Sequence, residues 1–202
     1  MSSVIGHALG AVVVWEAGRR LPGDWVPRGR AWYLAPALVA VAPDLDTIIR
    51  MAVGPAAGIS HRGASHSVLI AAVLAGTATA AVCVTHRQAR VGRVFAVLFG
   101  CALVHPLFDF LMAGGRPVPF LWPFVSRGWL SPVQLVPTAY YARTPGGLLS
   151  LVGRPGSWAG VGLELLSLGP LWLALRSRRA LTSALCVLVS LGGFLLTYFI
   201  YN

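Results

Sequence analysis

The stretch RVFAVLFGCALVHPLFDFLMA, residues 93–113, predicts the class of this fold. It is apolar over about the 20 residues that a helix needs to cross the hydrocarbon core of a bilayer. An arginine stands at its first position, and His105 and Asp109 lie toward its other end. Ionisable side chains within membrane segments are costly and usually functional. The stretch therefore predicts a transmembrane helix that contributes to a functional site.

The whole chain has the composition of an integral membrane protein. Of its 202 residues, 56% are hydrophobic and 11% are charged, whereas a soluble domain carries about 25% charged residues. We predict an all-α fold, a polytopic transmembrane helix bundle of about six helices that forms a single domain over residues 1–202. The hydrophobic segments lie at roughly 3–17, 31–50, 67–85, 93–113, 158–175 and 180–200.

Three features depart from a plain bundle. The first segment is short for a span, and no basic region precedes it, so we expect it to be retained and not cleaved as a signal peptide. The second segment is interrupted by Pro36 and Pro43, which predicts a broken helix lining a cavity enclosed by protein. Residues 114–157 predict one long extracytoplasmic connection rich in glycine, proline and aromatic residues.

The basic residues indicate topology and argue against a nucleic-acid partner. The net charge is +10, and all sixteen basic residues are arginines. Cytoplasmic loops carry an excess of Lys and Arg, and one path through the six segments places three arginine clusters together in the cytoplasm. The clusters are Arg19, Arg20, Arg28 and Arg30; Arg87, Arg90 and Arg93; and Arg176, Arg178 and Arg179. The arginines left on the outer side are Arg50, Arg62, Arg116, Arg127, Arg143 and Arg154.

This topology brings ionisable residues from four segments to one side of the membrane. His105 and Asp109 are four residues apart and share a helix face. Two aspartates that follow Pro43 suit a non-helical turn with both carboxylates inward, and we expect Gly63 to permit the tight backbone between two further histidines. The convergent set is His7, Asp44, Asp46, His61, His66, His105 and Asp109.

Imidazole and carboxylate without thiolate predict a divalent-metal site. The donor set suits zinc first, with manganese or iron as alternatives and magnesium where oxygen ligands dominate. We expect one or two ions, with an aspartate not used as a ligand acting as general base. The candidates for the base are Asp44, Asp46 and Asp109.

Residues beside the metal ligands are candidates for substrate binding. Arg62 is expected to hold a phosphate or carboxylate through its two-pronged donor face. Ser65 is a weaker candidate, and so is Ser67, which can equally cap the next helix. Arg116 and Arg127 are expected either to extend an anionic pocket or to contact lipid headgroups.

Each part of the set also has a simpler interpretation. In this interpretation Asp44 and Asp46 cap a helix at the membrane surface. His61 and His66 are then ordinary interfacial loop residues, and His105 forms a structural hydrogen bond with Asp109. His86 lies in a basic turn, and we leave it out of the site.

Three motifs support the metal-site interpretation. PDLD at 43–46, HRGASHS at 61–67 and HPLFD at 105–109, with a histidine near the N-terminus, resemble the YdjM-like family of bacterial inner-membrane proteins. LWPF at 121–124 is similar to that family's aromatic motif, although Val125 here separates it from Ser126. The resemblance covers roughly residues 5–126. It implies a membrane-bound metal-dependent hydrolase of the bacterial inner membrane.

We therefore expect a hydrolase whose site faces the extracytoplasmic side, near the lipid headgroups. Its substrate is expected to be a phospholipid or a lipid-linked phosphoester, attacked by a water whose pKa the metal lowers to about 7. The alternatives are a lipid amidase with the same metal site, a divalent-cation transporter, and a membrane scaffold with a structural metal. Membrane lipid is the solvent and the expected substrate, and the sequence predicts no oligomeric state.

Overall fold

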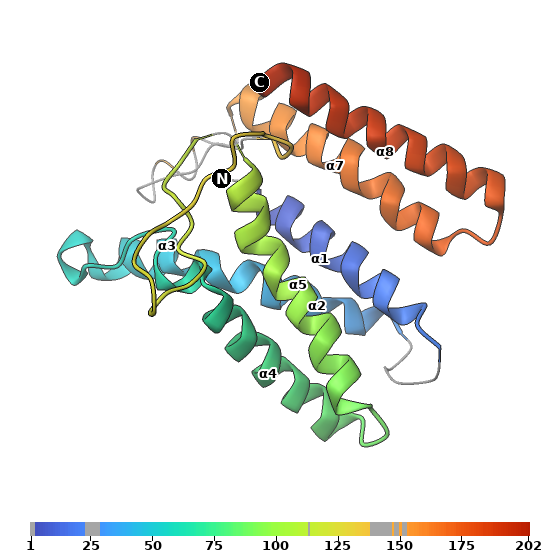
Figure 1. Ribbon diagram of the computed structural model, residues 1–202, viewed down its shortest axis with the longest axis horizontal. Coiled ribbons are helices and arrows are strands. Elements are labelled where there is room, and N and C mark those ends of the chain that lie inside the picture. Colours follow the sequence, from blue (N-terminus) through green and yellow to red (C-terminus); the bar gives the residue numbers. More distant parts are fainter. Residues whose placement is uncertain (1–2, 23–28, 113, 138–146, 148–149, 151–152) are drawn as a thin grey trace.

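A computed structural model describes residues 3–22, 29–112, 114–137, 147, 150 and 153–202. Over these residues the fold is helical (Figure 1), and four helices, α4, α5, α7 and α8, are long and apolar enough to cross a membrane. When α2 and α3 are counted as halves of one broken helix, the helices correspond to the six predicted segments. The helices are α1 Val4–Arg19, α2 Leu34–Val41, α3 Leu45–Val53, α4 Val68–Thr85, α5 Val91–Leu111, α7 Pro155–Arg176 and α8 Ala180–Tyr201.

The second segment is broken at one of its two prolines. A 3-10 turn at Ala42–Asp44 separates α2, which has 8 residues, from α3, which has 9. Pro43 lies in this turn, whereas Pro36 lies in the first turn of α2. The prediction of a second interruption at Pro36 was wrong because the first N–H groups of a helix have no intrahelical partner to lose.

Helix α5 is central in the bundle. It packs against α1, α2 and α4, while the α7–α8 hairpin attaches mainly through contacts of α7 with α1. Glycines of α1 permit these close approaches. A Cβ at Gly10 would lie 2.7 Å from Cζ of Phe108, and one at Gly18 would lie 2.6 Å from Cγ2 of Val97. The apolar core lies between these helices and includes Ala11, Trp15, Val94, Leu98 and Cys101.

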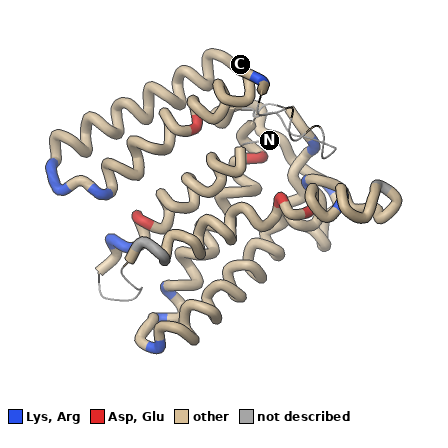
Figure 2. Tube along the Cα trace, turned by 180° about the vertical axis from the view of Figure 1, so that it is seen from behind, with Lys and Arg blue, Asp and Glu red and all other residues tan. Residues whose placement is uncertain are grey.

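The described arginines of the three clusters lie at one end of the bundle, as the predicted path requires. Figure 2 shows basic positions gathered at the helix ends and turns. Arg20 donates a hydrogen bond to the carbonyl of Ser177 at 3.3 Å, and Arg93 donates one to the carbonyl of Pro22, so the clusters are neighbours. Arg28 and Arg143 lie outside the described residues.

The connection after α5 covers the opposite end. Phe120 accepts a backbone hydrogen bond from Val68 at 2.9 Å, and Leu111 accepts one from Leu135 at 2.9 Å. These bonds tie the connection to the start of α4 and to the end of α5. Its aromatic tip stays exposed, with Phe124 85% accessible. The chain therefore closes over the end of the bundle where the broken helix, α4 and α5 meet.

Candidate metal centre

All seven predicted ligand residues meet at this covered end. They come from α1, the turn at Ala42–Asp44, α3, the loop before α4, and α5. Four of them, His7, His66, His105 and Asp109, are 0% exposed. The least buried is His61, whose side chain is 13% exposed. The site is thus enclosed by protein, with its most accessible edge at His61.

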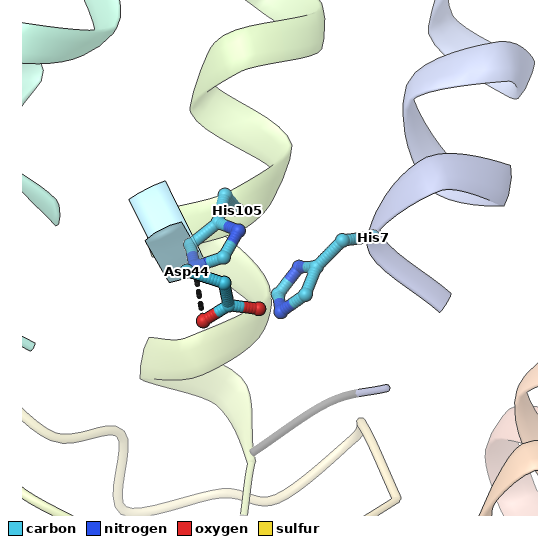
Figure 3. A group of neighbouring side chains, drawn as sticks. All are labelled: His7, Asp44 and His105. Carbon is cyan, nitrogen blue, oxygen red and sulfur yellow. Dashed lines mark ion pairs between the residues drawn. The ribbon is translucent and has the colours of Figure 1, made fainter. Parts of the chain in front are cut away.

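Two histidine rings and a carboxylate converge from separate segments (Figure 3). The ring of His7 stacks on that of His105, with centroids 3.8 Å apart and an angle of 16° between the planes. Oδ1 of Asp44 lies 3.6 Å from Nε2 of His105. Nδ1 of His105 is 2.6 Å from the carbonyl oxygen of Ala40 and must donate to it. The neutral ring therefore directs an unprotonated Nε2 at the site.

His66 presents a second imidazole nitrogen to the same point. The hydroxyl of Ser65 donates to Oδ2 of Asp46 at 2.8 Å, so its oxygen accepts from Nδ1 of His66 at 2.9 Å. This hydrogen bond leaves Nε2 of His66 unprotonated in the neutral ring. Nε2 of His66 lies 3.0 Å from Nε2 of His105. Two lone pairs that face each other in a buried site require a cation or a proton between them.

Asp46 orients the neighbouring residues. Its Oδ1 is 3.0 Å from Nδ1 of His61 and accepts from the Thr47 hydroxyl at 3.1 Å, while its Oδ2 accepts from Ser65. Carboxylates that hold ligand histidines in this way fix the ring orientation and the tautomer. Asp46 was expected as a metal ligand, and its hydrogen bonds indicate a supporting position.

Arg62 points into the protein. Its side chain is 1% exposed, and its Nε donates to Oδ2 of Asp109 at 2.9 Å. Its Nη1 donates to the carbonyls of Gly114 and Arg116 at 3.1 and 2.9 Å, and its Nη2 contacts the sulfur of Met112. The expectation of a two-pronged face open to a substrate phosphate is not supported, because these donors already hold the connection after α5 against Asp109.

The tight backbone in this loop lies at Arg62 and not at Gly63, where we predicted it. Arg62 has a φ of 58°, whereas Gly63 has a φ of −91°. Non-glycine residues seldom adopt positive φ, and such conformations concentrate at functional sites. The glycine is needed for space: a Cβ on Gly63 would lie 2.8 Å from the carbonyl oxygen of Ser60.

Several buried nitrogen and oxygen atoms of the kind that bind metals lack a hydrogen-bond partner among the described residues. They are Nδ1 and Nε2 of His7, both oxygens of Asp44, and Oδ1 of Asp109. Leaving such groups unsatisfied in a protein interior costs roughly 1–3 kcal/mol each, and an unseen ion is a usual explanation. The atoms are those that a divalent metal binds, so the residues present fit the expected metal.

Ligand atoms of three overlapping groups lie within 4.8 Å of one another. Asp44, His66 and His105 each belong to two of the groups, which is compatible with one ion or with two. Asp46 stands outside them among the residues described. The groups are His7, Asp44 and His105; Asp44, His61 and His66; and His66, His105 and Asp109.

The structure supports some of the simpler interpretations and contradicts others. Asp44 makes no side-chain cap hydrogen bond at α3, so capping does not explain it. Ser67 does cap α4, because its Oγ accepts from the backbone N–H of Ile70 at 3.2 Å. His86 ends α4 at the arginine-rich end, away from the site. Arg116, Ser126 and Arg127 are exposed.

Sequence reasoning missed the partners that come from backbone or from weakly polar side chains. The carbonyl of Ala40 orients His105, and the thioether of Met112 contacts Arg62. Neither atom has a recognisable sequence pattern. Thr47 stands next to Asp46, and the position of this hydroxyl within the PDLDT stretch was the one available signal.

Comparison with known proteins supports the motifs. A family model described as YdjM inner membrane protein matches residues 1–200. The match extends beyond the expected 5–126 and includes both C-terminal helices. The chain is also similar to the inner membrane protein YbcI of Escherichia coli (strain K12), with 31% identity over 109 residues, which cover 52% of this chain.

The aligned region spans 61% of YbcI, so the chain covers about three fifths of that relative's length. No solved structure matches the chain. The family match over nearly the whole sequence is the decisive finding. The chain belongs to the family of YdjM inner membrane proteins.

Proposed function

We propose that this protein is a metal-dependent hydrolase that acts within the membrane on a phospholipid or a lipid-linked phosphoester. The observation that carries the proposal is a set of buried nitrogen and oxygen atoms on His7, Asp44 and Asp109 that have no hydrogen-bond partner within the described part of the chain. A purely structural polar cluster would satisfy such atoms with one another. Their convergence in an enclosed site instead favours metal-assisted chemistry.

The residues divide into binding and supporting roles. His7, His66, His105 and Asp44 offer the ligand atoms, with His61 at the more accessible edge. Asp46 orients His61 through a 3.0 Å contact. A bound divalent metal would supply Lewis acidity and would lower the pKa of a bound water. Oδ1 of Asp109 is buried and accepts no hydrogen bond from the residues that the structure describes, so it is positioned to accept a proton, while Arg62 holds the other oxygen in place.

The surroundings of the accessible edge favour a lipid substrate. Helix α3 begins directly after Asp44 and exposes Leu45, Ile48 and Ile49, which are 49%, 62% and 48% accessible. These side chains form one apolar stripe at helical spacing. A phosphoester that approaches the site there would meet hydrocarbon beside it. The arginine clusters at the opposite end favour a site on the extracytoplasmic side.

The interior beyond the site argues against a cation pathway. Between the site and the arginine-rich end, the described interior contains Ala11, Trp15, Leu98 and Cys101, all 0% exposed. These residues form one continuous apolar cluster. A divalent cation that crossed this region would lose its hydration without gaining ligands. The arrangement therefore supports hydrolysis over transport.

The proposal is tested with purified protein in lipid vesicles. Labelled phospholipids of the common classes and a lipid-linked phosphoester are incubated with zinc, manganese or magnesium. We expect a product that needs metal, is lost in His105→Ala and is retained in His86→Ala, which removes a histidine at the other end. Absence of any metal-dependent phosphate-containing product would contradict the proposal. A lipid with an amide-linked fatty acid is assayed in parallel, and metal-dependent release of that fatty acid would indicate the lipid amidase instead.

A further inference from the structure

The C-terminal hairpin contributes a buried acid that the proposed chemistry does not use. Glu164 lies in α7 and is 1% exposed. Its Oε1 accepts a hydrogen bond from the backbone N–H of Ser3 at 2.7 Å, and its Oε2 accepts one from the Ser3 hydroxyl. Ser3 is the N-cap of α1. A carboxylate of one helix thus sits on the first turn of another.

The local sequence of α1 is suited to this approach. Oγ of Ser3 accepts from the backbone N–H of Gly6 at 2.9 Å, which closes the cap. A Cβ on Gly6 would lie 2.6 Å from Oε2 of Glu164, so a larger residue would displace the carboxylate. Glycine at this position is therefore explained by the acid that packs against it.

The contact between Glu164 and the start of α1 is electrostatically favourable. The first N–H groups of a helix lack intrahelical partners, and the N-terminus carries a partial positive charge. Burying an ionised carboxylate without such partners is strongly unfavourable. Glu164 and the start of α1 therefore stabilise each other, and the contact lies in the interface of α1 with α7 through which the hairpin attaches.

The first turn of α1 also carries a residue of the metal centre. His7 follows Gly6, and its backbone N–H donates to the carbonyl of Ser3 at 3.0 Å. Among the described residues its ring nitrogens have no hydrogen-bond partner, and Oδ1 of Asp109 lies 3.8 Å from Nε2, beyond hydrogen-bond distance. The position of the ring depends on the placement of α1 and on stacking against His105.

We infer that Glu164 is a positioning residue: by anchoring Ser3 and Gly6, it holds the first turn of α1 where His7 reaches Asp44 and His105. The inference rests on the proposed metal centre. It assigns the α7–α8 hairpin a part in completing that centre, although the hairpin supplies no ligand of its own among the described residues.

The test is a double-mutant cycle on metal affinity. Zinc binding to the full-length protein in detergent is titrated against a competing chelator for wild type, Glu164→Leu, His7→Ala and the double variant. Glu164→Leu is expected to weaken binding by about tenfold, the lower end of the range for residues that support metal ligands. In the His7→Ala background the same change is expected to have less than about a twofold effect, because residues that act through one another are not additive.

A merely structural role would produce a different pattern. Loss of packing alone would lower affinity equally in both backgrounds, and that result would overturn the inference, as would an unchanged affinity in Glu164→Leu. If Glu164→Leu fails to fold, Glu164→Gln replaces it in the cycle, since the amide keeps one acceptor for Ser3 and removes the charge. A wild type that binds no metal would overturn the metal centre itself. A metal-binding wild type with an unaffected Glu164 variant would overturn only the role of Glu164.

Two matched controls accompany the cycle. Glu16→Leu removes the chain's other glutamate, which lies in α1, accepts from Tyr33 and stands about 13.5 Å along the helix from His7. Gly162→Ala adds a methyl group to α7 where nothing lies within 4 Å, whereas Gly6→Ala places it against Glu164. We expect Gly6→Ala to weaken metal binding through His7 and both controls to leave it unchanged. Weakening by the controls to the same extent would contradict a specific role for the Glu164 contact.

Discussion

Nε2 of His66 lies 3.0 Å from Nε2 of His105, in an interior where neither histidine is exposed. Each ring directs its Nδ1 at an oxygen, Ser65 in one case and the Ala40 carbonyl in the other. The hydrogen bonds therefore orient both unprotonated nitrogens toward the same point. Two imidazole ligands of one zinc ion stand about 3.3 Å apart when the Zn–N bonds are about 2.0–2.1 Å. The observed 3.0 Å separation is close to that value, which supports the proposal that these two nitrogens bind one ion.

Metal binding is expected to stabilise the folded protein. Chelator-treated protein should melt at a lower temperature than protein with zinc, because a ligand that binds only the folded state at 100 times its Kd adds about 2.7 kcal/mol. The measurement is thermal unfolding in detergent, with and without zinc. His86→Ala should keep the full shift and His66→Ala should lose most of it. Equal shifts in the two variants would argue that zinc binds elsewhere.

Asp44 and Asp46 should respond in opposite ways to the same substitution. Neither oxygen of Asp44 accepts a hydrogen bond from a described residue, so Asp44→Asn should leave the metal-free protein as stable as wild type or more stable. Asp46 accepts from Thr47 and Ser65, so Asp46→Asn should cost about 1–3 kcal/mol without metal. Asp44→Asn should also abolish the stabilisation by zinc. Chemical denaturation with and without zinc measures the stability of both variants. A strongly destabilised metal-free Asp44→Asn variant would contradict the assignment of Asp44 as a metal ligand.

The convergence of the ligand residues was predictable from the sequence because it follows from helix direction alone. Arginine clusters fix which segment ends lie together, and a spacing of four residues places His105 and Asp109 on one face. The break in the second helix followed from Pro43, which lies within the 3-10 turn.

What the sequence could not predict depends on side-chain direction and on contacts between distant segments. Arg62 was expected to face a substrate, but its direction is determined by Asp109 and by the carbonyls of a connection that has no regular pattern. The position of Gly63 indicated a special backbone conformation, whereas the glycine instead provides room for Ser60. Glu164 was recognisable as an acid within an apolar segment, but its partner Ser3 is 161 residues away.

Arg62 should be important for stability even without metal or substrate. Arg62→Met removes the ion pair with Asp109 and two hydrogen bonds to backbone carbonyls, and it leaves a buried carboxylate without its cation. Removing one partner of a buried ion pair costs about 3–5 kcal/mol. Arg127→Met, at an exposed position, should change the free energy of unfolding by less than about 0.5 kcal/mol. Denaturation of the metal-free proteins separates the two, and a fully stable Arg62→Met variant would restore the substrate-binding role expected from sequence.

Gly63 should tolerate no side chain because there is no space for one. A Cβ at this position would lie 2.8 Å from the backbone oxygen of Ser60. The loop between His61 and His66 must then shift, and overpacking of this kind costs about 1–3 kcal/mol. Because the loop carries two of the candidate ligands, Gly63→Ala should also weaken zinc binding. Gly76→Ala is the matched control, since nothing lies within 4 Å of its Cβ in α4 and alanine favours a helix. The free energy of unfolding and the zinc affinity are measured for both variants. If Gly63→Ala matches Gly76→Ala in both quantities, the loop accommodates the added methyl group and the prediction is wrong.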